Sequence, residues 1–264
     1  MPIVILTAGV VVAVAAAVRS TWSPCGLSML STITPFGERS RGHRYGATAG
    51  WFVAGSLLGG ATLGAVAAGL AAAMRATGVA GHPAWAAGAV ALAAGATAAI
   101  DAGVFGDLIP IWRRQVNDQW LVRYRNWVYG VGFGWQIGVG VATYIMTAAV
   151  FLVVVLGALT ASPLMAAALG VLFGVVRGLA VLLTAKADSP ERLRALHRRF
   201  DQAGPPVRAA VIAVQAGVAL AGVAVLAYLA IQWPLAGVAA GLAVAVLVVG
   251  VGAAVSRAAR AWAS

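Results

Sequence analysis

The chain has 264 residues, of which 62% are hydrophobic and only 9% are charged, and its net charge is +11 at pH 7. Soluble domains carry about 25% charged residues, so this composition excludes an ordinary soluble domain. The lysines and arginines stand in short stretches between apolar runs, without a basic face or interleaved aromatic residues, which argues against nucleic-acid binding. Apolar runs long enough to cross about 30 Å of hydrocarbon instead predict a protein of the lipid bilayer.

Seven apolar segments predict an all-α polytopic membrane protein with about seven transmembrane helices. In chain order they cover residues 2–37, 47–74, 84–104, 128–159, 164–183, 209–231 and 235–255. The first and fourth are longer than one crossing requires and contain prolines or glycines, so we expect helices 1 and 4 to be interrupted. The N-terminal segment lacks the basic start of a signal peptide and is expected to stay in the mature protein.

We expect a single transmembrane domain, residues 1–264, with an inverted 3+3 repeat plus one helix. Residues 1–104 form the first half-repeat, residues 128–231 the second, and residues 235–255 the extra helix. Interrupted helices at matching positions of two halves indicate a transporter-like fold with a solute site where they meet. Glycines at spacing four, such as Gly55 with Gly59 or Gly60 with Gly64, predict close helix packing.

The distribution of positive charge predicts the orientation in the membrane. The loops after the first, third, fifth and seventh segments hold 15 of the 18 lysines and arginines, whereas the alternate loops hold only Arg75. Cytoplasmic loops are rich in Lys and Arg. We therefore expect a multi-pass protein of the bacterial plasma (inner) membrane, with its N-terminus outside and its C-terminus in the cytoplasm.

Two segments on the cytoplasmic side of this topology, residues 107–127 and 188–202, repeat apolar side chains at helical spacing between arginines. The pattern fits amphipathic helices that lie on the membrane surface. Solvated basic loops that set the topology fit as well, and we favour them for both segments.

The first interrupted segment contains RSTWSPCGLSMLSTITPFG, residues 19–37, with the only cysteine of the chain, Cys25. Pro24 removes a backbone donor, so we expect one half-helix to end at Ser23-Pro24 and another to start there. Cys25 then lies near the N-terminus of the second half-helix, where the helix dipole favours a thiolate or another anion. A packing role fits this thiol equally, because cysteine often serves as a small buried hydrophobe.

The candidate solute site combines residues of both interrupted segments with one arginine of the fifth. Arg19 and Arg177 are the only cations inside predicted spans, and charges buried in a membrane suggest function. Arg177 is also close to the end of its span, so snorkelling or structural pairing fits it as well. Asp101 is the expected charge partner of either arginine, although a helix-end residue that meets water fits it slightly better. The predicted site residues are Arg19, Trp22, Ser23, Pro24, Cys25, Gln136, Thr143, Tyr144 and Arg177.

The stretch WSPCGLSMLSTITPFGE resembles the first cysteine segment of the transmembrane thiol-disulfide interchange proteins of the cytochrome c biogenesis (DsbD/CcdA) family. Members of that family carry Ser-Pro-Cys at the end of the first apolar segment, often with a later proline before a basic loop. The resemblance extends to hydropathy over residues 2–231, and the family belongs to the lysine-exporter-like superfamily. It implies a redox relay in which Cys25 is the first catalytic cysteine.

The chain departs from the family pattern because it has no second cysteine. The family uses two cysteines, one in each interrupted helix. The fourth segment has Gln136, Gly138, Gly140 and Thr143 where the second is expected. A lone thiol cannot run an internal exchange cycle, so a partner protein has to supply the resolving thiol.

We favour an integral membrane transporter-like protein that moves a small anionic or sulfur-containing solute through a site at interrupted helices 1 and 4. One alternative is a membrane thiol-redox component that works through Cys25 with a thioredoxin-like partner, and another is a non-catalytic membrane subunit or assembly factor. An enzyme is less favoured, because no nucleophile–base or carboxylate pair is apparent. We expect no cofactor and no metal, since one cysteine and three dispersed histidines offer no ligand spacing. The expected partners are the bilayer, the solute and a membrane or thioredoxin-like protein.

Overall fold

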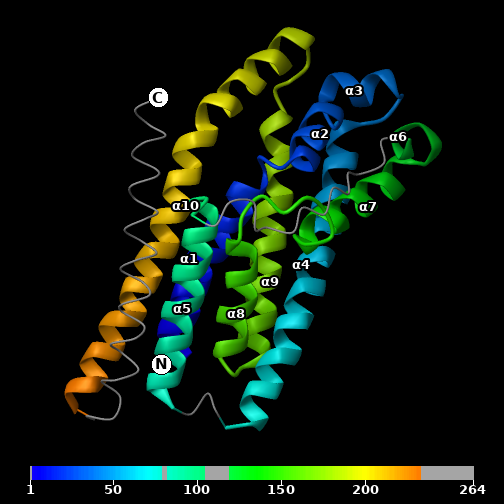
Figure 1. Ribbon diagram of the computed structural model, residues 1–264. Coiled ribbons are helices and arrows are strands. Elements are labelled where there is room, and N and C mark those ends of the chain that lie inside the picture. Colours follow the sequence, from blue (N-terminus) through cyan, green and yellow to red (C-terminus); the bar gives the residue numbers. More distant parts are fainter. Residues whose placement is uncertain (1, 79–81, 105–118, 233–264) are drawn as a thin grey trace.

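The computed structural model describes residues 2–78, 82–104 and 119–232 (Figure 1). Helices and turns make up these residues, with no strand among them, in agreement with the all-α prediction. Within them, five helices are long and apolar enough to cross a membrane, which supports a membrane-embedded protein. The predicted seventh span, residues 235–255, and most of the segment 107–127 lie outside the described residues.

The long helices match the predicted spans to within a few residues, except that the first and fourth spans are interrupted and the sixth is part of a longer helix. They are α1 (Pro2–Ser20), α4 (Tyr45–Ala76), α5 (Pro83–Asp101), α9 (Pro163–Leu179) with its 3-10 continuation η2 (Ala180–Thr184), and α10 (Pro190–Gln232). All but α4 begin with a proline, which suits the first turn of a helix because the N–H groups there have no partner within the helix.

The first predicted span is interrupted, as expected. It consists of α1, then α2 (Pro24–Thr32) and α3 (Pro35–Ser40). The Ser23 side chain accepts a hydrogen bond from a backbone N–H in the first turn of α2, and Pro24 takes the first helical position. The 19 residues of α1 are about 28 Å long, so the break comes after nearly a full crossing length of helix.

The fourth predicted span is interrupted as well. It consists of α7 (Asn126–Val139), an irregular stretch over residues 140–148, and α8 (Ala149–Leu159). Gly140 ends α7 with φ at +77°, a left-handed conformation that a glycine adopts without steric cost. Each of the two helices is shorter than a single crossing, so two short helices stand where one long span was predicted. The inverted repeat stays a prediction.

Glycines allow α4 to approach α7 and α9 closely. A Cβ atom added at Gly55 would lie 2.2 Å from the backbone oxygen of Val131 on α7, and one at Gly60 would lie 2.5 Å from that of Gly170 on α9. Side chains do not fit in such spaces, so the backbones contact each other directly, as the glycine spacing predicted.

Helix α10 joins two segments that the sequence pattern separates. The amphipathic segment 188–202 and the sixth predicted span, 209–231, belong to one helix of 43 residues. Residues 190–202 are therefore helical, and their position on a membrane surface stays a prediction. Pro205 and Pro206 lie inside α10, where each removes a backbone hydrogen-bond donor. We call residues 190–204, which precede the prolines, the α10 arm.

The α10 arm packs against the broken first span. The indole N–H of Trp22 donates to the backbone oxygen of Phe200 at 2.8 Å, and the two rings lie 4.9 Å apart. Ser31 Oγ on α2 and His197 Nε2 on the arm are 3.1 Å apart. The arm therefore contacts the break through Phe200 and α2 through His197.

Figure 1 shows α1, α5, α8, α9 and α4 running side by side, with α2, α3 and the short helix α6 (Trp120–Arg123) gathered at one end of the bundle, in the upper part of the view. The α10 arm rises at the same end. The core between α1, α5, α8 and α9 is filled by buried side chains such as Leu152, Leu156 and Phe173. The break of the first span lies between this core and the end of the bundle that holds α2, α3 and α6.

Candidate functional site at the break of the first span

Arg177 is a buried cation near the C-terminal end of α9, with 2% of its surface exposed. Its Nη2 donates to the backbone oxygen of Ser20 at 3.3 Å and to Ser23 Oγ at 3.4 Å. Nε and Nη1 have no hydrogen-bond partner among the described residues. Burying a cation is unfavourable when some of its donors have no acceptor. The Nε and Nη1 atoms of Arg177 could therefore each donate to a further acceptor.

Two elements place the guanidinium at the break. Phe173, one turn earlier on α9, sets its ring 5.8 Å below the guanidinium carbon, within the range of a cation–π contact. On the other side, Ser23 caps the N-terminus of α2 by accepting from Gly26 N–H at 3.1 Å. Anions are stabilised near helix N-termini. The guanidinium and the α2 terminus thus both favour negative charge at the same place.

Cys25 is buried next to this cation, with 1% of its surface exposed. Its thiol is close enough to Arg177 for the two groups to interact electrostatically. The same residue packs in an apolar cluster with Met29 and Phe133. Both roles expected for Cys25, packing and proximity to positive charge, are therefore compatible with its surroundings.

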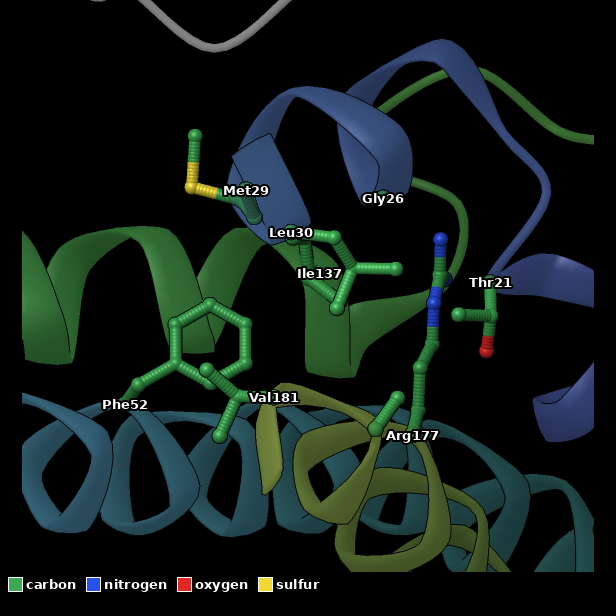
Figure 2. A pocket seen from close by; sticks show the side chains of 9 residues that line it. Thr21, Gly26, Met29, Leu30, Phe52, Ile137, Arg177 and Val181 are labelled. Atoms are coloured by element: carbon green, nitrogen blue, oxygen red, sulfur yellow. The ribbon is translucent and has the colours of Figure 1, made fainter. Parts of the chain in front are cut away.

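A cavity of about 10 Å³ lies between α2 and α9. Figure 2 shows the Arg177 side chain reaching from α9 toward the turn with Thr21 and toward Gly26 on α2. Phe52 and Ile137 line the apolar side of the cavity. This volume corresponds to about one water molecule, so a solute enters only if α2 moves relative to α9.

Of the three site residues predicted from the fourth span, only Tyr144 contacts the cluster around Cys25. Tyr144, in the irregular stretch, packs against the apolar cluster that contains Cys25. Thr143 is 1% exposed, and its Oγ1 has no partner among the described residues. Gln136 is half-buried on α7 and forms no side-chain hydrogen bond within the described part of the chain.

Arg19 and Asp101 belong to a second cluster, away from Arg177. With Arg208 they line a pocket of about 20 Å³ between α1, α5 and α10. Trp22 contacts the α10 arm instead of either cluster. The structure therefore does not bring the predicted site residues together in one place.

A buried carboxylate that the sequence did not single out anchors the same end of the bundle. Glu38 of α3 is 0% exposed and accepts from Arg41 Nη2 at 2.6 Å, from Thr48 Oγ1 at 2.6 Å and from Tyr129 OH at 2.8 Å. His43 Nδ1 lies 3.7 Å from the carboxylate. These contacts tie α3 to α4 and α7. No sequence signal marked Glu38, because it stands in a charged stretch that reads as a solvated loop.

Comparisons with known proteins give one partial similarity. No protein-family model matches the chain, and no solved structure matches it. The chain is similar to the methylamine utilization protein MauF of Methylophilus methylotrophus, with 31% identity over 156 residues, which make up 54% of this chain and 50% of MauF. The chain thus spans about half the length of the curated relative it matches. The resemblance to the DsbD/CcdA family stays a prediction.

Proposed function

We propose that the chain is a membrane transporter-like protein that binds a small anionic or sulfur-containing solute at the break between α1 and α2. The observation that carries the proposal is the buried guanidinium of Arg177, whose Nε and Nη1 have no partner among the described residues. Buried charges in membrane proteins commonly mark solute or ion pathways. An anion that accepts from these nitrogens satisfies donors that are otherwise buried without partners.

The break itself supports an anion as the ligand. The N-terminus of α2, capped by Ser23, adds backbone dipoles of the same sign as the guanidinium. Half-helix N-termini recognise anionic groups in the interrupted helices of transporters. The break ends a nearly full-length α1, so the site is nearest to the end of the bundle where the α10 arm packs. Under the predicted orientation, this end is cytoplasmic.

Movement at the break is part of this proposal. The cavity beside Arg177 has room for about one water, so the described conformation is closed to a solute. The α10 arm lies on α2 and Trp22, and Pro205 and Pro206 leave α10 with fewer hydrogen bonds between the arm and the span. Displacement of α2 together with the arm opens the Arg177 donors to the solvent.

Uptake of radiolabelled sulfate and thiosulfate by liposomes that contain the full chain tests the proposal. We expect Arg177→Gln to abolish uptake and Arg177→Lys to retain part of it, because lysine keeps the charge but not the forked donors. Arg75→Gln is the matched control, since Arg75 is exposed at the far end of α4. Uptake by Arg177→Gln at the rate of the unaltered chain contradicts the proposal.

Thiol-redox chemistry with a thioredoxin-like partner is a second candidate, favoured by the position of Cys25 beside Arg177. A neighbouring cation stabilises a thiolate, which is the reactive form of cysteine. The partner has to reach a thiol that is 1% exposed, so this function also requires α2 to move. Cys25→Ser separates the two candidates. In a transporter it leaves anion uptake intact, because Arg177 supplies the donors. In a redox component it abolishes the mixed disulfide that Cys25 forms by displacing thionitrobenzoate from the one remaining cysteine of a thioredoxin whose resolving cysteine is replaced.

The similarity to MauF suggests that the protein takes part in methylamine utilization. MauF is named for methylamine utilization, and we carry that process to this chain as a proposal, because the similarity covers about half of each protein. A Methylophilus methylotrophus strain that lacks MauF is the appropriate host for a test. Restored growth on methylamine after expression of this chain supports the shared process, and growth only on other carbon sources speaks against it.

A further inference from the structure

Asp101 is the centre of a polar cluster at the C-terminal end of α5. Its Oδ2 accepts from Thr147 Oγ1 at 2.5 Å and from Gln215 Nε2 at 3.0 Å. Its Oδ1 accepts from the backbone N–H of Ala148 at 2.7 Å. Thr147 and Ala148 immediately precede α8, and Gln215 belongs to α10. One carboxyl group therefore connects α5 with α8 and α10.

The two side-chain partners of Asp101 are buried, and one of them has an unused acceptor. Thr147 is 1% exposed and Gln215 is 0% exposed. The Oε1 atom of Gln215 has no hydrogen-bond partner among the described residues. Burying an acceptor without a donor is unfavourable. An additional proton in this cluster would give Gln215 Oε1 a donor.

The side-chain partners of Asp101 suit both protonation states of its carboxyl group. A hydroxyl and an amide each contain a donor and an acceptor. When Oδ2 carries a proton, that proton can be donated to Thr147 Oγ1, or to Gln215 Oε1 after the amide has turned over. Oδ1 accepts from Ala148 N–H in both states.

Glu38, a fully buried carboxylate, differs from Asp101 in this respect. It forms an ion pair with Arg41 at 2.6 Å, and a guanidinium can only donate. Asp101 takes part in none of the ion pairs within the described ranges.

Two arginines face Asp101 from the helices packed around it. Arg19 comes from the last turn of α1, and Arg208 comes from α10. Arg208 is exposed, and its guanidinium donates to the backbone oxygen of Asp101 at 2.7 and 3.1 Å instead of to the carboxylate. Helix α8 contributes no titratable group. The charges of the three residues sum to +1 with Asp101 ionised and to +2 with Asp101 protonated.

We propose that Asp101 is a proton-binding site, in which Oδ2 takes up a proton from water at this end of the bundle while Thr147 and Gln215 serve both protonation states. Protonation removes the negative charge that faces Arg19 and so raises the positive potential at the end of α1. The proton site stands on the geometry of the Asp101 cluster alone, without the transport proposal.

The further step, that the proton bound at Asp101 drives anion transport as the coupling ion, rests on the proposed function. Arg19 faces Asp101, and the next residue, Ser20, accepts a hydrogen bond from Arg177. The last turn of α1 therefore connects the proton site to the proposed anion site. Proton binding at Asp101 then strengthens anion binding, and anion binding strengthens proton binding by the same factor.

Infrared difference spectroscopy of the full chain in lipid nanodiscs, recorded between neutral and acidic pH, tests the proton site directly. A protonated carboxyl group has a carbonyl stretching band that a carboxylate lacks. All seven Asp and Glu residues of the chain can give such a band on acidification. The band of Asp101 is therefore the component that we expect in the unaltered chain and in Glu38→Gln and that we expect to be missing from Asp101→Asn. Identical bands in the unaltered chain and in Asp101→Asn overturn the proposal.

Thr147→Val keeps the carboxyl group and serves if Asp101→Asn does not fold. It removes one hydrogen-bond partner of Oδ2, so we expect the band to shift to higher frequency; an unshifted band contradicts the assignment. The measurement needs no solute and no transport. Failure of anion uptake therefore leaves the proton site unaffected, and loss of the band leaves the Arg177 site unaffected.

Discussion

Arg177 on α9 donates a hydrogen bond to the backbone oxygen of Ser20, the last residue of α1, at 3.3 Å. The contact joins residues 157 positions apart and places a cation where the first helix breaks. Carbonyl groups at a helix C-terminus have no partners within the helix and attract positive charge. Nη2 of Arg177 therefore gives the last carbonyl group of α1 a hydrogen-bond donor, while Nε and Nη1 have no partner among the described residues.

Gly26→Ala is expected to destabilise the break. A Cβ atom at Gly26 would lie 2.3 Å from the backbone oxygen of Thr21, which is backbone that cannot move aside without shifting the turn. We expect a loss of about 1–3 kcal/mol in the free energy of unfolding, measured by thermal unfolding in detergent. Gly69→Ala is the control, because a Cβ atom there meets nothing within 4 Å on exposed α4; its stability should equal or exceed that of the unaltered chain. Equal stability of both variants contradicts the tight packing of α2 on the turn.

Tyr129→Phe is expected to loosen the anchor around Glu38. The substitution removes the hydroxyl that donates to the buried carboxylate at 2.8 Å and keeps the ring contacts. Leaving a buried carboxylate with one donor fewer costs about 1–3 kcal/mol, which thermal unfolding measures. Tyr124→Phe, at an exposed tyrosine, should leave the unfolding temperature unchanged. A loss of the same size in both variants would show that the effect is not specific to Glu38.

Trp22→Phe is expected to release the α10 arm. It deletes the N–H that donates to Phe200 and preserves an aromatic ring for stacking. One hydrogen bond contributes about 1 kcal/mol, so cleavage by trypsin at Arg198 and Arg199 should accelerate roughly fivefold. Trp127→Phe, which alters an exposed tryptophan of α7, provides the matched comparison. Unchanged cleavage in Trp22→Phe rules out the arm contact as a barrier to opening.

The interrupted helices could be predicted because proline and glycine act locally. Pro24 and Gly140 determine the backbone where they stand, and both breaks are present at the expected segments. The continuity of α10 could not be predicted in the same way. Pro205 and Pro206 are typical of a helix boundary, yet α10 continues through them, and the arm contacts Trp22 and α2, which are distant in the sequence.

The candidate site was harder to predict than its elements, because its contacts join distant parts of the chain. Arg19 and Arg177 read as one pair of buried cations, whereas α1 directs Arg19 toward Asp101 and α10. Successive helical residues point about 100° apart, so Arg19 and Ser20 face different neighbours. Glu38 draws its partners from α4 and α7 as well as from its own helix. No single stretch of sequence contains that cluster.

The reactivity of Cys25, the only cysteine in the chain, measures the charge at the proposed site most directly. With Arg177 beside it, a negatively charged methanethiosulfonate reagent should label Cys25 about tenfold faster than a positively charged reagent of similar size, equivalent to about 1.4 kcal/mol. Sulfate should slow this labelling, and Arg177→Gln should remove both the preference and the protection by sulfate. Equal rates for the two reagents in the unaltered chain, or no labelling by either reagent, would contradict a solute-accessible anion site at the break.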